Sequence, residues 1–367
     1  MKLRGLIFST SLLLLMIMSV TAFGQSYTKE KRVERSFPIY DDTEIEISNK
    51  YGDITIENWD KDSVKVVIDY KVVSTKEAKL NKTFDAISFD FKANQYYVVV
   101  NTEFIGSGSF WSDVSDIASN LFTGGTNSSI DYIVYVPNSK NLKLNLKYGN
   151  IYMTNHTGDI KLSLSNGDLK AHKLSGNTQM DVVFGDMTIN NIVDGEIKIN
   201  YGSLITEDAT RLKISGQSSE YEISNVEHLI VDSKRDKIEV DEAGTISGET
   251  YFTHIVIDEL RETVDLKTKY GSLKVKEFNS DVKAVNLNAT NTTVNIYLQE
   301  EENYQIDITS DDKADITYSS GLGDFTTQEI SGKDKIMNAK CLYGDMQNAI
   351  PINIDMRSGL LSIKLEK

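Results

Sequence analysis

The chain has one cysteine, Cys341, and only three prolines. A single cysteine excludes a disulfide framework, so a hydrophobic core has to supply the stability. Scarce proline is typical of long paired strands, in which every backbone N–H is needed as a donor. No apolar run reaches the roughly 20 residues that a membrane-spanning helix needs. We therefore expect no transmembrane segment in the mature chain.

The sequence also lacks the motifs of several common enzyme classes. It contains no G-x-S-x-G, no H-E-x-x-H and no G-x-x-x-x-G-K-[ST]. The four histidines show no recurrent metal spacing and are predicted to be surface residues: His156, His172, His228 and His254. Cys341, beside Leu342 and Tyr343, is predicted to be a buried thiol rather than a nucleophile. We therefore predict no catalytic residue, no enzyme activity and no cofactor.

Carboxylates are plentiful but form no recognised metal motif. Asp311-Asp312 with Asp315, and Asp232 with Asp236, could offer oxygen ligands to calcium. Neither an EF-hand loop nor a G-G-x-G-x-D nonapeptide is present, so no metal site is predicted. The net charge of −15 argues against binding to nucleic acid or to anionic membranes. The acidic residues are spread along the chain, which indicates solvated strand faces.

What the chain does contain is a recurring phrase: an aromatic residue, a glycine, an acidic or small polar residue, then an aliphatic residue. It begins at Tyr51-Gly52, Tyr148-Gly149, Phe184-Gly185, Tyr201-Gly202, Tyr270-Gly271 and Tyr343-Gly344, and Asn166-Gly167 is a variant without the ring. Glycines recur every nine residues from Gly149 to Gly185, so alternate glycines are about 18 residues apart. A fixed period of about 20 residues predicts a solenoid, whose repeats bury their apolar faces by stacking.

Each repeat contains two runs in which apolar and polar residues alternate, as in 142–147 and 160–165. A period of two predicts strands with one face in the core. The glycines between the runs predict turns with positive φ, and the Asp, Asn or Ser that follows is expected to bond its own turn. The ring before each glycine is expected to stack on the ring one rung away, roughly 4.8 Å along the axis. The predicted fold is an all-β, right-handed β-solenoid with rungs of about 18 residues.

Residues 1–24 have the form of a secretory signal peptide. Lys2 and Arg4 precede an apolar run from Leu6 to Val20, and Ala22-Phe23-Gly24 supplies small residues for signal peptidase. The mature chain is expected to begin near Gln25, with no cysteine there to carry a lipid anchor. We expect export to the periplasm, to the outer-membrane surface or to the medium.

Residues 25–130 are predicted to form an N-terminal cap of strands with one short helix. Ser74-Thr75-Lys76-Glu77 has the form of a capping box and opens a helix to about Ile87. Residues 101–130 are a Gly/Ser-rich insertion with apolar residues at helical spacing. They predict either an amphipathic helix folded onto the solenoid or an exposed aromatic patch that meets a partner or a sugar ring. In the second case, the binding residues are Phe110 and Trp111.

Residues 131–367 are predicted to form the solenoid and a C-terminal cap, continuous with 25–130 as one domain. The glycine step loosens over 212–262, although the alternation of apolar residues persists. Residues 352–365 alternate around Arg357-Ser358-Gly359 and predict a final, hairpin-like cap.

Three features carry a family resemblance. They are the Tyr-Gly-Asp-Ile phrase at Tyr51, the lead-in Tyr135-Val136-Pro137 before Leu142-Lys143-Leu144, and the closing Gly359-Leu360-Leu361-Ser362-Ile363. With them, the chain resembles the DUF4097-type adhesin family of exported β-solenoid proteins, especially members from Bacteroidota. The resemblance covers most of the mature chain and is strongest over 45–60 and 131–365. It implies a β-solenoid and adhesion, and it brings no catalytic or ligand-binding residues to transfer.

Three functions fit these observations. The first is a non-catalytic, adhesin-like protein that binds a cell-surface or envelope partner, either a protein or a glycan. The second is a structural or signalling protein of the periplasm with a protein partner. The third, ranked lower, is a carbohydrate-active β-helix enzyme, which needs a base and paired carboxylates that converge in a groove. A ladder of Arg, Lys and Asp from neighbouring rungs in one groove would favour the third.

Overall fold

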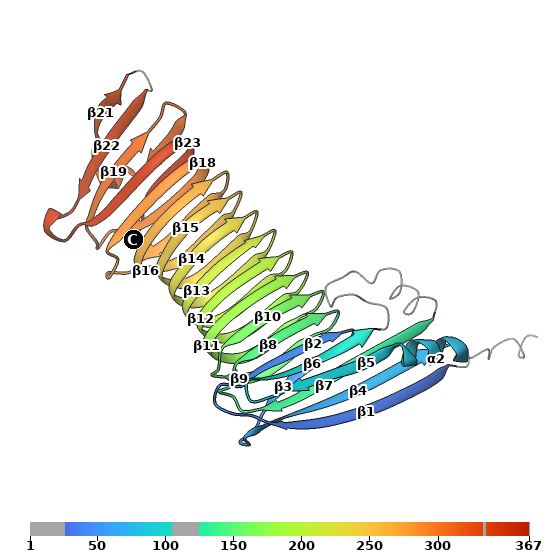
Figure 1. The fold of residues 1–367 in the computed structure, drawn as a ribbon. Helices are drawn as coiled ribbons and strands as arrows, with labels where there is room; N and C mark the ends of the chain where they lie inside the picture. Colours follow the sequence, from blue (N-terminus) through green and yellow to red (C-terminus); the bar gives the residue numbers. More distant parts are fainter. Residues whose placement is uncertain (1–25, 105–124, 333–334, 367) are drawn as a thin grey trace, which may run out of the picture. The chain divides into compact units, whose positions relative to one another are not determined.

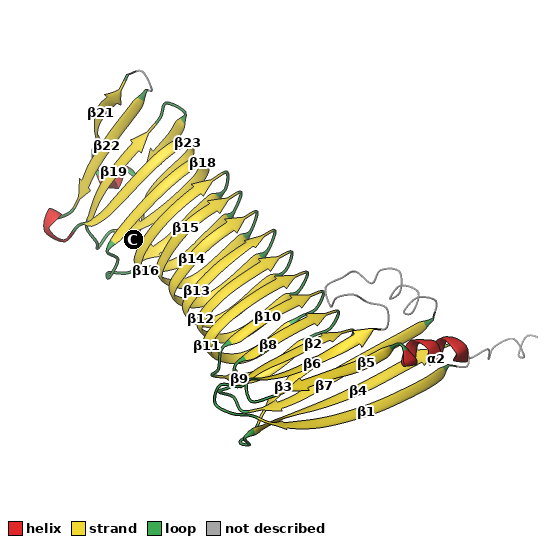
Figure 2. Cartoon of the chain, viewed as in Figure 1, coloured by secondary structure: helices red, strands yellow, loops and turns green. Residues whose placement is uncertain are grey.

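The computed structural model describes residues 26–104, 125–332 and 335–366. The chain divides into two compact units. The first unit comprises Met1–Arg32, Asp69–Ser88 and Glu103–Ser129, and the second comprises Val33–Ile68, Phe89–Thr102 and Ile130–Lys367. Strands dominate the described residues, among which α2 (Glu77–Asp85) is the one α-helix (Figure 2).

In the first unit, α2 is held by a ring contact. The ring of Tyr70 stacks on Phe84 of α2 with centroids 4.7 Å apart, and its hydroxyl donates to the Thr83 carbonyl over 3.3 Å. The predicted helix is confirmed, but the capping box is wrong. Lys76 is the N-cap, and the Ser74 hydroxyl accepts from the Lys76 N–H over 3.2 Å, because strand β4 runs through Ser74. Strands with residues in this unit include β1 (Tyr27–Pro38), β4 (Ser63–Ser74) and β5 (Ile87–Ala93).

The second unit is an all-β solenoid, as the sequence repeat predicts (Figure 1). Each rung has two strand segments joined at a corner, and equivalent segments of successive rungs pair in parallel, with Leu162 opposite Met180 and Ile214 opposite Val231. The strands of these rungs are β2 (Glu44–Lys50), β3 (Ile54–Asn58), β6 (Tyr97–Phe104), β7 (Thr126–Val136), β8 (Leu142–Lys147), β9 (Ile151–His156), β10 (Ile160–Ser165), β11 (Leu169–Val183), β12 (Asp186–Asn200), β13 (Ser203–Gln217), β14 (Glu220–Lys234), β15 (Lys237–Tyr251), β16 (His254–Lys269), β17 (Ser272–Phe278) and β18 (Ala284–Gln299).

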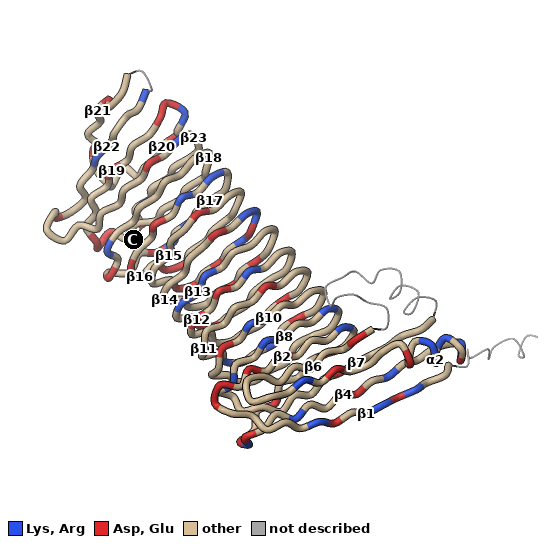
Figure 3. The backbone as a smooth tube through the Cα atoms, in the orientation of Figure 1, with Lys and Arg blue, Asp and Glu red and all other residues tan. Residues whose placement is uncertain are grey.

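Inward side chains of successive rungs form continuous apolar columns. One column contains Ile47, Leu144, Leu162, Met180 and Ile197, each at most 3 % exposed. Removing each such side chain from water stabilises the fold by about 1.5–3 kcal/mol. The alternate side chains point outward, and Figure 3 shows acidic and basic residues spread along the rungs of this unit. The charge is therefore distributed over strand faces, as the sequence pattern predicts.

The C-terminal part does not end in the predicted hairpin-like cap. β23 (Ile350–Glu366) is one bent strand that pairs in parallel with β18 on one side. On its other side it pairs with β19 (Tyr304–Ser310) and β20 (Ala314–Tyr318). The last strand is thus inserted as a rung between earlier ones, because its alternating apolar residues continue both neighbouring columns. Outside it lie η1 (Ser320–Leu322), β21 (Thr326–Ser331), β22 (Ile336–Tyr343) and η2 (Met346–Asn348), with β22 antiparallel to β19.

Candidate binding surfaces

The corner between the two strand segments of each rung holds a residue in the left-handed conformation. These residues, with φ between 50° and 69°, are Tyr51, Tyr148, Asn166, Phe184, Tyr201, Ser218, Arg235, Phe252, Tyr270, Asn291 and Ser358. The corners continue at a step of 17 through Tyr201, Ser218, Arg235 and Phe252. The predicted loosening of the glycine step over 212–262 is therefore confirmed: Ser219, Asp236 and Thr253 replace the glycine, and the rungs are kept.

The glycines of the phrase allow the backbones of neighbouring rungs to approach closely. At Gly149, Gly167, Gly185, Gly202 and Gly271 the predicted positive φ is not found, and the preceding residue adopts it instead. A Cβ on Gly185 would lie 2.0 Å from the Gly167 carbonyl oxygen, and one on Gly167 would lie 1.8 Å from that of Gly149. Only glycine lets these backbones stack at such a distance.

At several corners the polar residue after the glycine bonds a neighbouring rung. The Asp53 carboxylate accepts the Asn150 N–H over 2.7 Å, and the Asn150 side chain accepts the Asp168 N–H over 3.0 Å. The Asp168 carboxylate in turn accepts the Asp186 N–H over 3.1 Å. The expectation that these side chains hold their own turn is thus wrong at these three corners, because the neighbouring rung brings an N–H within reach. It is confirmed at Asp345, which follows Gly344 and accepts the Gln347 N–H over 3.1 Å.

Buried polar side chains replace glycine in the middle rungs. Asp236, at the glycine position after Arg235, accepts from the Ser219 N–H over 2.8 Å and from the Ser233 hydroxyl over 2.7 Å. Burial raises the pKa of Asp236, and these hydrogen bonds act in the opposite direction. The Ser219 hydroxyl donates to the Ile199 carbonyl over 3.1 Å. These contacts close the corner from inside, so the Asp236 carboxylate stabilises the corner.

The aromatic corner residues form the first candidate surface. We define the aromatic edge as Tyr148, Phe184, Tyr201, Phe252 and Tyr270, each 44–55 % exposed. Phe184 stacks on Tyr201 with centroids 5.1 Å apart, and Phe252 stacks on Tyr270 at 5.0 Å. Tyr148 stacks on Tyr51 at 5.3 Å. The predicted stacking between rungs is therefore found wherever rings occupy adjacent corners.

Two ring positions differ from the sequence prediction. Phe252 was missed because Thr253 follows it in place of glycine, and the 17-residue step from Arg235 is the signal that could have found it. Tyr343-Gly344 has the phrase but is not a rung corner. Tyr343 ends β22 and lies against Tyr304 with centroids 6.2 Å apart, since this strand runs antiparallel to its neighbour.

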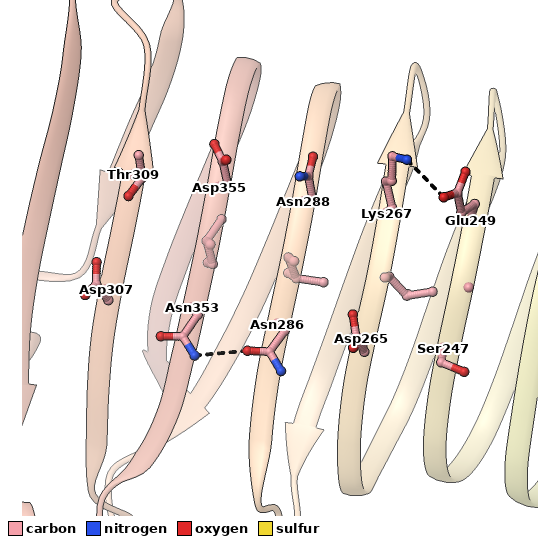
Figure 4. A pocket seen from close by; sticks show the side chains of 14 residues that line it. Ser247, Glu249, Asp265, Lys267, Asn286, Asn288, Asp307, Thr309, Asn353 and Asp355 are labelled. Carbon is pink, nitrogen blue, oxygen red and sulfur yellow. Dashed lines mark hydrogen bonds and ion pairs between the residues drawn. The ribbon is translucent and has the colours of Figure 1, made fainter. Parts of the chain in front are cut away.

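A groove of about 700 Å³ on the outer face of β15, β16, β18, β23 and β19 is the second candidate surface (Figure 4). Two rows of polar side chains line it. The first row, in strand register, is Ser247, Asp265, Asn286, Asn353 and Asp307. The second row is Glu249, Lys267, Asn288, Asp355 and Thr309. The groove thus brings together residues that are far apart in the sequence: Ser247 and Asp355 are separated by 108 positions.

Most charged side chains of the groove are engaged in ion pairs. Lys267 pairs with Glu249 at 2.9 Å, and Arg357 pairs with Asp355 at 2.8 Å. Asp307 pairs with Lys340 at 2.8 Å. What the groove offers a ligand is therefore chiefly amide, hydroxyl and carboxylate hydrogen-bonding groups.

The structure tests some of the residue predictions made from the sequence and leaves others untested. Phe110 and Trp111 lie outside the described residues, so the binding role predicted for them stays a prediction. Cys341 is buried, its thiol donates to the Leu322 carbonyl over 3.1 Å, and burial raises its pKa, which confirms the predicted buried thiol. Within the described ranges, no three His, Cys, Asp or Glu side chains are grouped to hold a metal ion. No helix among those residues is long and apolar enough to cross a membrane.

The surface prediction is confirmed for His172, His228 and His254 but is wrong for His156. It is 1 % exposed and lies in register with buried Leu174, while the other three are exposed. Its Nε2–H donates to the Lys140 carbonyl over 2.7 Å. Its buried Nδ1 has no hydrogen-bond partner within the part of the chain that the structure describes. Burial therefore lowers the pKa of His156 below its ordinary value of 6.5.

This burial predicts acid sensitivity. Because the folded pKa of His156 is lowered, the unfolded chain takes up the proton first as the pH falls. The stabilisation that neutral His156 contributes is fully present above the pKa that this residue has in the unfolded chain. It is lost as the pH falls through the lower pKa that the residue has in the folded chain. We expect the urea midpoint to fall between about pH 7 and about pH 5.5. The fall should be smaller in His156→Gln, which keeps an N–H donor. The exposed-site control His172→Gln should behave as the wild type, and an equal fall in all three proteins would contradict the assignment.

No family model and no curated protein matches the sequence. Three crystal structures are similar at 12 % identity, covering 92 % of this chain. They are of a putative cell adhesion protein from Clostridium sporogenes (TM-score 0.22, 100 % of that chain), a putative adhesin from Bacteroides fragilis (0.25, 97 %) and a putative lipid binding protein from Parabacteroides distasonis (0.25, 97 %). The solenoid fold follows from this chain's own parallel strand register.

Proposed function

We propose that this chain is an exported, non-catalytic, adhesin-like β-solenoid that binds an envelope or cell-surface partner along the aromatic edge. The observation that carries the proposal is the exposure of its five rings, at 44–55 % each. The rings occupy corners of one regular unit, so a partner with an extended or repeating surface can contact several rings at once. Aromatic side chains are the residues most often found to dominate binding energy at such contacts.

The solenoid itself does not require rings at these corners. Asn166, Ser218, Arg235, Asn291 and Ser358 hold the same left-handed conformation without a ring. Ring and non-ring residues alike bear the cost of that conformation, about 1–2 kcal/mol, so a ring adds only the energy of its stack, about 0.5–1.5 kcal/mol. Stacking is therefore a small gain that the other corners do without, whereas contact with a partner accounts for half-exposed rings.

The charges of the groove support a non-catalytic role. A glycoside hydrolase needs one carboxylic acid that stays protonated beside a second carboxylate. Burial raises the pKa of Asp307, but hydrogen bonds from Lys340 and Asn338 outweigh it and hold the pKa below its usual range. Two further groove carboxylates, Glu249 and Asp355, are engaged in ion pairs. The converging charges that would favour an enzyme are present, but all except Asp265 are arranged as paired ions.

Export is part of the proposal and rests on the signal-type residues 1–24. Protease treatment of intact cells that produce the full chain tests it together with surface exposure. We expect the chain to be cut while a known periplasmic protein in the same cells stays whole. If the chain is cut only after the outer membrane has been opened, the adhesin-like proposal is contradicted. The result would then favour the alternative, a periplasmic structural or signalling protein with a protein partner.

A further inference from the structure

The groove exists because one outward column changes from long to short side chains. Upstream, this column carries mostly long side chains, in the order Lys143, Lys161, Gln179, Glu196, Lys213 and Ile230. From β15 onward it carries only short polar residues, which form the first row of the groove. Gly248 lies between the two rows and adds no side chain. The groove therefore results from short side chains on five strands that are adjacent in the sheet.

We propose that this groove binds a neutral, polyhydroxylated glycan chain that lies across the strands. Asn353 donates to Asn286 over 2.9 Å, which leaves further amide donors and acceptors of this pair for hydroxyl groups (Figure 4). Asp265 and Asn288 are exposed, and their side chains make no hydrogen bond or ion pair with other residues that the structure describes. Neighbouring strands are about 4.8 Å apart, so these groups repeat along the groove as sugar units repeat along a chain.

The charge of the groove selects for a neutral ligand. Three of its four carboxylates are matched by Lys267, Arg357 and Lys340. The remaining carboxylate, Asp265, gives the groove an uncompensated negative charge. A glycan with uronate or sulfate groups would be repelled there, whereas sugar hydroxyls can donate to the carboxylate.

This site is separate from the aromatic edge, so it can fail while the proposed function stands. The test is isothermal titration calorimetry on residues 26–367. The ligands are three neutral hexasaccharides, of glucose, mannose and N-acetylglucosamine, and an anionic hexamer of galacturonic acid. We expect at least one neutral hexasaccharide to bind and the anionic hexamer to bind at least about tenfold more weakly.

Filling the groove provides the decisive variant. Ser247→Lys with Asn286→Lys places in two rungs the residue type that the same column carries upstream, so the fold has room for it. This double variant should weaken binding at least about tenfold. The control Lys161→Ser, made in the same column outside the groove, should bind as the wild type, and all proteins should share one circular dichroism spectrum. The inference is overturned if no neutral hexasaccharide binds, if the filled variant binds as the wild type, or if the anionic hexamer binds best.

Discussion

Replacing Gly185 by alanine is expected to lower the free energy of unfolding by about 3 kcal/mol or more. The added Cβ would lie 2.0 Å from the Gly167 carbonyl oxygen and 3.1 Å from its carbon. Both are backbone atoms of the neighbouring rung, so relief requires the rungs to separate. That separation would stretch the ladder hydrogen bonds on both sides of the corner. Urea unfolding followed by circular dichroism measures the loss as a lower midpoint.

The same chain offers a matched control. Ser219 occupies the glycine position of another corner, so Ser219→Ala places an alanine there without adding a Cβ. It removes the hydroxyl that donates to the Ile199 carbonyl over 3.1 Å, which should cost about 1 kcal/mol. If Gly185→Ala and Ser219→Ala lower the midpoint equally, the glycine is not required for close approach between rungs.

The solenoid could be predicted because its signals are local. Alternation of apolar and polar residues fixes strands and their inward faces, and the phrase at Tyr148, Phe184 and Tyr201 marks the corners. What each corner residue does is not local. The left-handed conformation belongs to the ring residue rather than the glycine, because the glycine's hydrogen atom faces the carbonyl oxygen of the next rung. The sequence period contains no information about that contact.

The C-terminal order could not be predicted from periodicity. β23 pairs with β18, so Val285 faces Ile352 across 67 positions, whereas the rungs from β8 to β16 advance by 17 or 18. Alternation shows that residues 350–366 form a strand but not which strands lie beside it. The groove depends on this insertion, because Asn353 and Asp355 complete its rows only when β23 lies between β18 and β19.

The aromatic edge was partly visible in the sequence. Four of its rings belong to the phrase, and the expected stacking is found, but nothing local shows that the rings stay exposed. Exposure follows from the left-handed corner, which places the ring outside the stacked strands. The sequence instead directed attention to Phe110 and Trp111, whose role remains a prediction.

The second large effect concerns binding through the aromatic edge. Phe184→Asn, Tyr201→Asn, Phe252→Asn and Tyr270→Asn, combined, copy the residue found at the corner of Asn166. Asparagine tolerates the left-handed conformation, so the fold should be kept. Each lost ring at a contact typically costs 1 kcal/mol or more, so we expect binding to fall at least about 100-fold.

Binding of labelled residues 26–367 to intact bacterial cells and to a panel of immobilised polysaccharides, with the groove filled by Ser247→Lys and Asn286→Lys in every protein, tests the central claim most directly. The control is Ile205→Asn with Ile230→Asn, which removes apolar side chains that are 45 % and 49 % exposed away from the corners. The account predicts that the wild type and this control bind at least one of these surfaces alike, while the four-ring variant does not. Equal binding by the four-ring variant, or no binding by the wild type to any of them, would contradict it.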